Sequence, residues 1–217
     1  MHHFIDDLRL VARAQPEKPI LVGASMGGLL GLAVAGESSE PPFSALVLVD
    51  ITPRWETRGV ERILDFMRAW PQGFADSEEA AQAIADYLPH RRGSRGTEQL
   101  QSLLRPGTDG RLYWHWDRAM LEPVAEEGER YQPGLIEAAS RVRIPVMLLS
   151  GGRSDVVSDA TIGEFLTLVP HARHQSLPRA THMVAGDDND AFTRAIAAFI
   201  GVDVESDGTR PADAGMA

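Results

Sequence analysis

Residues 20–28 read Ile-Leu-Val-Gly-Ala-Ser-Met-Gly-Gly, and this stretch decides the fold of the 217-residue chain. The first three residues form a short apolar run, which is typical of a strand buried on both faces. The next five match the pattern Gly-x-Ser-x-Gly, and a small-residue helix is predicted to follow. A serine on such a strand-to-helix turn holds its hydroxyl free of the backbone. Ser25 is therefore a candidate nucleophile, the alternative being a purely structural glycine-rich turn.

Outward from this stretch, strand and helix patterns alternate along the chain. Apolar runs at residues 45–49 and 146–149 predict two further buried strands, and residues 174–177 predict a short fourth one. A closing amphipathic helix is expected over residues 189–200. Because strand, helix and strand follow one another, the sequence predicts an α/β fold with a mostly parallel sheet.

The segment between the second and third strands differs from the rest of the chain in composition and in hydrophobic period. It is charged, helical in period, and contains all four tryptophans and all three tyrosines of the chain. One of its helices is expected to run from Thr97 through Leu104. We therefore divide the chain into a first part of the core (1–50), a helical cap (51–143), a second part of the core (144–200) and a flexible tail (201–217).

Composition narrows the classes of partner. The net charge of −10, from 31 acidic and 21 basic residues, would repel phosphate backbones, so no nucleic-acid partner is expected. Cysteine is absent, which excludes disulfides and thiolate chemistry. Residues 20–36 carry no charge but hold five glycines, so they indicate a strand, a turn and a helix and not a membrane span. With no basic leader ahead of an apolar stretch, we expect a cytoplasmic protein without a membrane partner.

A nucleophilic serine needs a base and an acid, and the chain offers candidates after its later strands. Asp155 follows the third predicted strand, and His182 follows the fourth. Because the carboxyl ends of parallel strands meet at one edge of a sheet, Ser25, Asp155 and His182 are expected to converge. Asp50 ends the second strand and is the alternative acid, although bonding to nearby loop amides is the role more expected of it.

Other assignments remain open for these residues. Asp155 could instead be a turn or N-cap aspartate that bonds to nearby backbone, and His182 could be an ordinary loop histidine. His171 and His174 are rival bases, but they lie before or within the last strand, at the wrong end of the sheet. The backbone N–H of Met26, at the start of the helix, is the expected oxyanion donor.

These pieces together resemble the α/β-hydrolase fold superfamily. The resemblance rests on ILVGASMGG (20–28), ALVLVDITP (45–53), IPVMLLSGGRSDVVS (144–158) and RATHMVAGDDNDAFTRAIAAFI (179–200). In family terms they are similar to strands five to eight, with a cap between six and seven. The resemblance implies Ser25 as nucleophile, Asp155 as acid and His182 as base.

The cap stretch DGRLYWHWD (109–117) resembles the caps of epoxide-hydrolase-like and peroxidase-like members. Trp114 and Trp116 are therefore candidates for a lid over the substrate, or else they pack the cap onto the core. Epoxide hydrolases of this fold have an aspartate as nucleophile on the strand-to-helix turn, whereas a serine there, Ser25, suits attack on a carbonyl. The resemblance thus implies a serine hydrolase for an ester, thioester, lactone or related substrate, with no metal, nucleotide or flavin.

The chain departs from the family pattern ahead of the strand-to-helix turn that carries the nucleophile, since only 24 residues precede Ser25. Family members have four more strands there, and an HG-type loop that supplies the second oxyanion N–H. Their absence implies roughly sixty or more missing residues. We therefore expect residues 20–24 to form an exposed sheet edge, with self-association and compromised activity. The alternative is a non-catalytic remnant, or a self-associating fragment.

Overall fold

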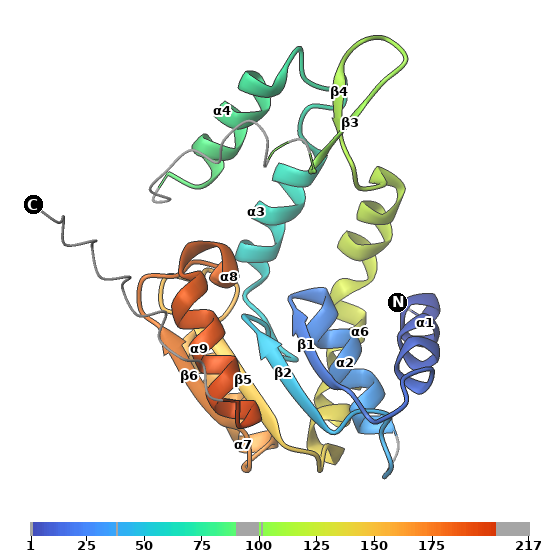
Figure 1. The fold of residues 1–217 in the computed structure, drawn as a ribbon, viewed down its shortest axis with the longest axis vertical. Helices are drawn as coiled ribbons and strands as arrows, with labels where there is room; N and C mark the ends of the chain where they lie inside the picture. The colour runs from blue at the N-terminus through green and yellow to red at the C-terminus, as the bar shows by residue number, and fades with distance from the viewer. Residues whose placement is uncertain (1, 38, 90–99, 101, 203–217) are drawn as a thin grey trace, which may run out of the picture.

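The computed structural model describes residues 2–37, 39–89, 100 and 102–202. Its centre is a sheet of β1 (Ile20–Ala24), β2 (Ala45–Val49), β5 (Val146–Gly151) and β6 (Arg173–Leu177), in the order β1-β2-β5-β6 (Figure 1). All three strand pairings are parallel. Every residue of the two central strands is buried, as expected for strands covered on both faces. The predicted α/β fold with a mostly parallel sheet is confirmed.

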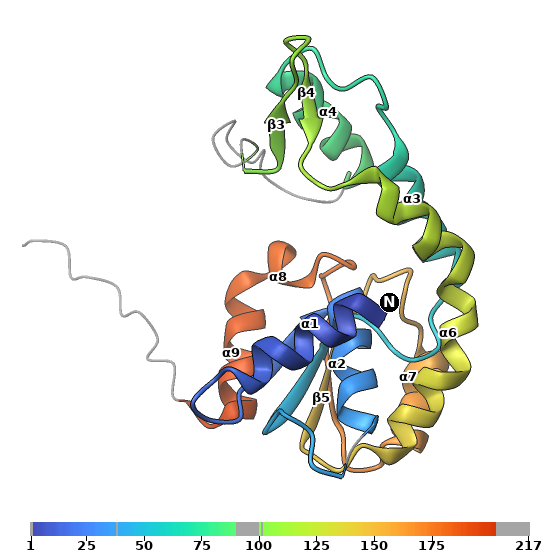
Figure 2. The ribbon, with the colours of Figure 1, turned by 90° about the vertical axis from the view of Figure 1, so that its right-hand side faces the viewer.

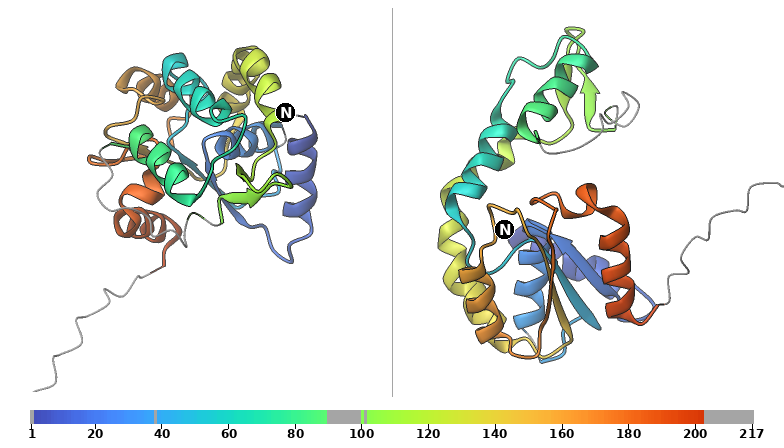
Figure 3. Two further views of the ribbon diagram at one scale, coloured as in Figure 1. Left: turned by 90° about the horizontal axis from the view of Figure 1, so that it is seen from above. Right: turned by 90° about the vertical axis from the view of Figure 1, so that its left-hand side faces the viewer.

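Helices cover both faces of the sheet (Figures 2 and 3). One face is covered by α1 (His2–Arg13), α2 (Met26–Glu37), the end of α6 (Leu121–Arg141) and α7 (Asp159–Leu168). The other face is covered by α8 (Val184–Asp187) and α9 (Asn189–Ile200). Side chains alternate along each strand, so Leu46 and Leu48 join the first cluster while Val47 and Val49 join the second. The two clusters together hold the sheet in the middle of the core.

The cap segment, residues 51–143, rises from the carboxyl ends of the strands. It contains α3 (Thr57–Arg68), α4 (Ser77–Tyr87), β3 (Leu104–Pro106), β4 (Leu112–Trp114), the short 3-10 helix η1 (Arg118–Met120) and α6. The two helices α3 and α6 run side by side and carry α4 and the β3–β4 pair away from the sheet (Figures 1–3). The last turns of α6 belong to the core, where they pack on α2.

The cap segment is not wholly helical, which differs from the prediction. The strands β3 and β4 pair antiparallel, and the turn between them uses Gly110 at φ +80°, a conformation that favours glycine. Of the helix predicted over residues 97–104, residues 97–99 and 101 lie outside the described residues. Leu100 is helical, whereas residues 102–103 form a turn and Leu104 begins β3. Most of the tail also lies outside them, since the description ends at Val202. Of the helices in the described residues, none has both the length and the hydropathy of a membrane span.

Candidate active site

Ser25 lies on the turn between β1 and α2, as the motif predicts. Its φ is 49°, in the left-handed region that costs a non-glycine residue about 1–3 kcal/mol. The turn is held by the Ser25 N–H, which donates to the Val49 carbonyl at 3.1 Å, and by the Ser25 carbonyl, which accepts from Gly28 at 3.0 Å. Such backbone strain, fixed by its neighbours, is typical of a functional position.

The two outer glycines of the motif, Gly23 and Gly27, have different steric surroundings at this turn. A Cβ on Gly23 would lie 2.5 Å from the backbone of Gly27, closer than any real contact, so the crossing of β1 and α2 requires glycine there. A Cβ on Gly27 would meet nothing within 4 Å. The close approach at Gly23 is what lets the chain reverse within the few residues around Ser25.

Met26 is the first residue of α2, so its backbone N–H lies at the N-terminal end of that helix. Within the described part of the chain it has no hydrogen-bond acceptor, as is usual for the first amides of a helix. A free N–H beside Ser25, reinforced by the dipole of α2, can stabilise negative charge. The structure thus leaves this amide available for the role expected of it.

Asp50 and His182 form the central contact of the site. Asp50 follows β2 directly and is completely buried, and its Oδ2 accepts a hydrogen bond from His182 Nδ1 at 2.7 Å. Gly151 N–H donates to the other carboxylate oxygen at 2.7 Å, and the Ser154 hydroxyl donates to Oδ2 at 2.5 Å. These three donors satisfy the hydrogen-bonding capacity of a carboxylate that water does not reach. Asp50 holds the imidazole with Nε2 as the nitrogen left to accept a proton.

The expected contact between Asp155 and His182 is not made in the described structure, and this prediction needs correction. Asp155 Oδ2 instead pairs with Arg62 Nε of α3 at 2.6 Å, so its carboxylate faces the cap segment. The reason lies in the turn after β5, which places Ser154 beneath Asp50 and directs the next residue outward. The alternative acid, Asp50, makes the contact that Asp155 was expected to make.

Ser25 and His182 are not joined by a hydrogen bond within the described residues. Catalytic hydrogen bonds are often long before substrate binds, so this arrangement is compatible with a resting site. The rival histidines have other partners: His171 Nε2 contacts the Ile144 carbonyl at 3.0 Å, and His174 Nε2 contacts Ser150 Oγ at 2.9 Å. Burial lowers the pKa of His174, which favours its neutral form.

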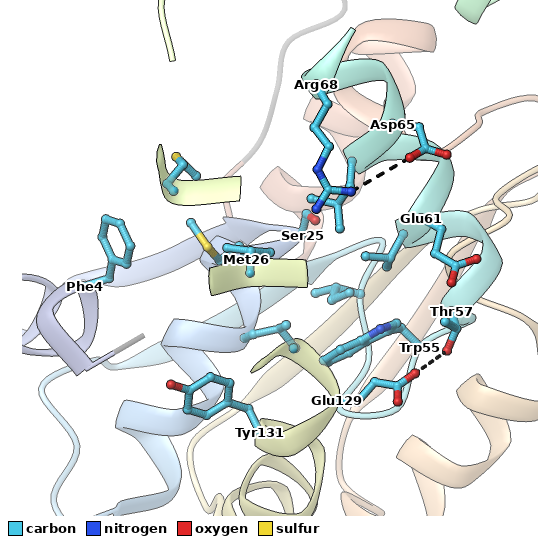
Figure 4. A pocket seen from close by; sticks show the side chains of 17 residues that line it. Phe4, Ser25, Met26, Trp55, Thr57, Glu61, Asp65, Arg68, Glu129 and Tyr131 are labelled. Carbon is cyan, nitrogen blue, oxygen red and sulfur yellow. Dashed lines mark hydrogen bonds and ion pairs between the residues drawn. The ribbon is translucent and has the colours of Figure 1, made fainter. Parts of the chain in front are cut away.

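A cavity of about 690 Å³ opens over Ser25 (Figure 4). Its walls come from α1, α2, α3, α6 and the loop after β2, and they are mostly apolar. The labelled lining residues are Phe4, Ser25, Met26, Trp55, Thr57, Glu61, Asp65, Arg68, Glu129 and Tyr131. A cavity of this size and apolarity, beside a nucleophile candidate, suits a small organic substrate.

Trp114 and Trp116, the candidates for a lid over the substrate or for packing of the cap onto the core, do not line this cavity. Their rings stack at 4.7 Å, and Trp114 packs on Phe74 within a separate cluster of the cap segment. Trp114 ends β4, and both indoles belong to a cluster that includes Phe66 of α3 and Ala80 and Ala83 of α4. Trp55 lines the cavity instead. Trp55 follows β2 closely, at the carboxyl ends of the strands, and this position in the sequence could have indicated that it lines the site.

Metal ligands do not gather at this site. In residues 2–202, apart from the stretches left undescribed, no group of three or more His, Asp or Glu side chains could hold a metal ion.

Comparison with known proteins assigns the family. Residues 2–195 match the model of the alpha/beta hydrolase family, and the chain belongs to that family. It is 28% identical to a 3-hydroxybutyrate-oligomer hydrolase of Cupriavidus necator, over 82% of this chain and 63% of that protein. It is 26% identical to esterase YbfF of Escherichia coli, over 86% of this chain and 68% of that protein. The chain thus spans less than two thirds of the first of these relatives.

A crystal structure of E-2-(acetamidomethylene)succinate hydrolase shares the architecture. Its TM-score is 0.80 at 25% identity, with 93% of this chain and 74% of that chain covered. The relatives named here are hydrolases or esterases, and the fold and family agree with them.

Proposed function

We propose that this chain carries the active site of a serine hydrolase that acts on a small ester, thioester or lactone. The observation that supports it best is the Asp50–His182 contact of 2.7 Å at the same edge of the sheet as the strained turn at Ser25. An acid, a base and a nucleophile from the ends of separate strands are the parts that acyl transfer needs.

In the proposed reaction, Ser25 Oγ forms a bond with the carbonyl carbon and its proton passes to His182 Nε2. Asp50 keeps the ring oriented and stabilises the imidazolium. The Met26 N–H donates to the oxyanion of the tetrahedral intermediate. Collapse breaks the bond to the leaving alcohol or thiol, which takes the proton from His182. Water then cleaves the acyl-enzyme by the same route in reverse, with His182 as base.

The choice of an ester is supported by two further points. The cavity beside Ser25 is lined mainly by apolar side chains, which suits the hydrocarbon part of an acyl group. The relatives include an esterase and a hydrolase of 3-hydroxybutyrate oligomers. For this chain, we propose carboxylic esters as the first substrates to test.

The test is hydrolysis of p-nitrophenyl butyrate by the purified 217-residue chain, beside Ser25→Ala and the control Ser140→Ala. Ser140 lies on the exposed side of α6, where its hydroxyl donates to the Glu137 carbonyl. We expect Ser25→Ala to lower turnover by at least about 10³-fold, because nothing else attacks the carbonyl, and Ser140→Ala to leave it unchanged. Turnover that survives Ser25→Ala, or none in the unaltered chain, would overturn the proposal for this chain.

A further inference from the structure

Arg68 is a cationic side chain of the cavity that the proposed reaction does not use. It lies on the last turn of α3 and reaches down toward Ser25 (Figure 4). Its side chain is only 32% exposed. A partly buried guanidinium beside a nucleophile candidate therefore requires an explanation.

The interactions of Arg68 leave much of its hydrogen-bonding capacity unused. It forms ion pairs with Asp65 at 3.9 Å and with Glu122 at 3.4 Å. In the part of the chain that the structure describes, it donates no well-aligned hydrogen bond. Its buried Nε lies 3.4 Å from Glu122 Oε1, an ion-pair contact without hydrogen-bond geometry. A guanidinium carries five N–H donors, and a buried donor without an acceptor costs free energy. A bound anion would supply the missing acceptors.

The two carboxylates that flank Arg68 are poor competitors for it. Their side chains are 79% and 68% exposed, so their attraction is screened by water and worth little. Two more acids of the cavity, Glu61 and Glu129, are also exposed, and Glu129 already accepts a hydrogen bond from Thr57. The acidic side chains thus lie at the rim, and the guanidinium faces inward.

We propose that Arg68 binds a carboxylate of the substrate, which makes half-esters of short dicarboxylic acids the preferred class. A planar guanidinium holds a carboxylate through two parallel hydrogen bonds, which fixes orientation as well as charge. The apolar wall formed by Leu29, Ile51 and Trp55 would hold the methylene chain between that carboxylate and the carbonyl at Ser25. This inference rests on the proposed function, since it assigns the substrate of the same site.

The kinetic test compares p-nitrophenyl hydrogen glutarate with its neutral methyl ester, which differs only in the charge. In Arg68→Met, we expect kcat/KM for the charged ester to fall about 10- to 100-fold, mainly through KM, because a charge-assisted hydrogen bond pair is lost. The neutral ester should change by less than about threefold. Arg68→Lys should restore part of the preference. Arg58→Met, at an exposed arginine of the same helix, is the matched control.

A binding test makes the inference independent of turnover. Calorimetry measures monomethyl glutarate binding to Ser25→Ala and to Ser25→Ala/Arg68→Met, and we expect binding only by the first. Turnover of the neutral ester with no preference that depends on Arg68 would overturn the inference and leave the proposed function standing. Binding that depends on Arg68, without turnover that depends on Ser25, would support the ligand class and overturn the proposed function. Absence of binding to Ser25→Ala would overturn the inference.

Discussion

At the scale of single residues, the site depends on which aspartate meets His182. Asp50 is fully buried, adopts φ 51° and accepts from three donors, whereas Asp155 is partly exposed and pairs with Arg62. Buried carboxylates with several donors are rigid and well placed to orient an imidazole. Exposed ion pairs contribute little to either geometry or stability. The structure therefore favours Asp50 as the acid of the proposed reaction.

The comparison of Asp50→Asn with Asp155→Asn tests this assignment. We expect Asp50→Asn to lower kcat on p-nitrophenyl butyrate by about 10²- to 10⁴-fold, because an amide can stabilise the wrong tautomer of His182 and no longer balances its charge. Asp155→Asn should lower it by no more than about fivefold. Urea unfolding of both variants separates a loss of chemistry from a loss of folded protein. If Asp155→Asn proved the more damaging in folded protein, the acid role would return to Asp155.

At the scale of elements, the turn between β1 and α2 depends on one glycine more than the other. A Cβ at Gly23 would overlap the backbone of Gly27, which side-chain movement cannot relieve. At Gly27, inside α2, an added Cβ would enter open space. The two outer glycines of the motif are therefore not equivalent in this chain.

Alanine at each position tests the difference. We expect Gly23→Ala to lower the free energy of unfolding by at least about 1–3 kcal/mol, the usual cost of overpacking, and to abolish turnover by displacing Ser25. Gly27→Ala should be neutral or stabilise by about 0.5–1 kcal/mol, since alanine favours the helix. Urea denaturation monitored by circular dichroism gives both values. Equal losses at the two positions would contradict the steric account.

At the scale of the whole molecule, two features stand out. The first is the connection between the cap segment and the core, where the Arg62–Asp155 ion pair lies beside Gly59 of α3. A Cβ on Gly59 would lie 2.1 Å from the Asp155 carbonyl, so the helix and the loop are in direct contact. Asp155 thus contacts α3 of the cap segment through both its carboxylate and its backbone.

The second feature is the edge of the sheet at β1. Among the described strands, β1 pairs with β2 alone, and Ile20 and Val22 are 40% and 43% exposed. On α1, Phe4, Leu10 and Val11 are exposed as well. An unpaired edge strand with apolar side chains is a template for pairing with a second chain. We propose that the 217-residue chain self-associates through β1.

Val22→Lys tests that proposal, because a charged side chain on an edge strand opposes pairing between chains. We expect the unaltered chain to elute from a sizing column above monomer mass, and Val22→Lys to shift it toward the monomer. Val202→Lys is the control, at an exposed apolar residue beyond α9. A monodisperse monomer of the unaltered chain would refute the proposal.

The amino-acid sequence by itself determined the α/β fold, the four strands of the sheet and the positions of Ser25 and His182. These signals are local, because a buried strand reads as an apolar run and the turn as Gly-x-Ser-x-Gly. The small β3–β4 pair left no comparable signal. Each of its strands is three residues long, too short for an alternating pattern to stand out.

Only the tertiary structure shows which of the two aspartates contacts His182 and which side chains line the cavity. Both Asp50 and Asp155 follow a strand, so their positions along the chain do not distinguish them. The direction of the Asp50 carboxylate depends on the fold of its turn and on partners 101 to 132 residues away in the sequence. The direction of the Asp155 carboxylate depends on Arg62 of the cap segment. Trp55 and Arg68 reach the cavity, and Trp114 does not, because of how α3, α6 and the β3–β4 pair pack. Side-chain direction in a turn is a product of packing, and a single sequence does not encode it in any local pattern.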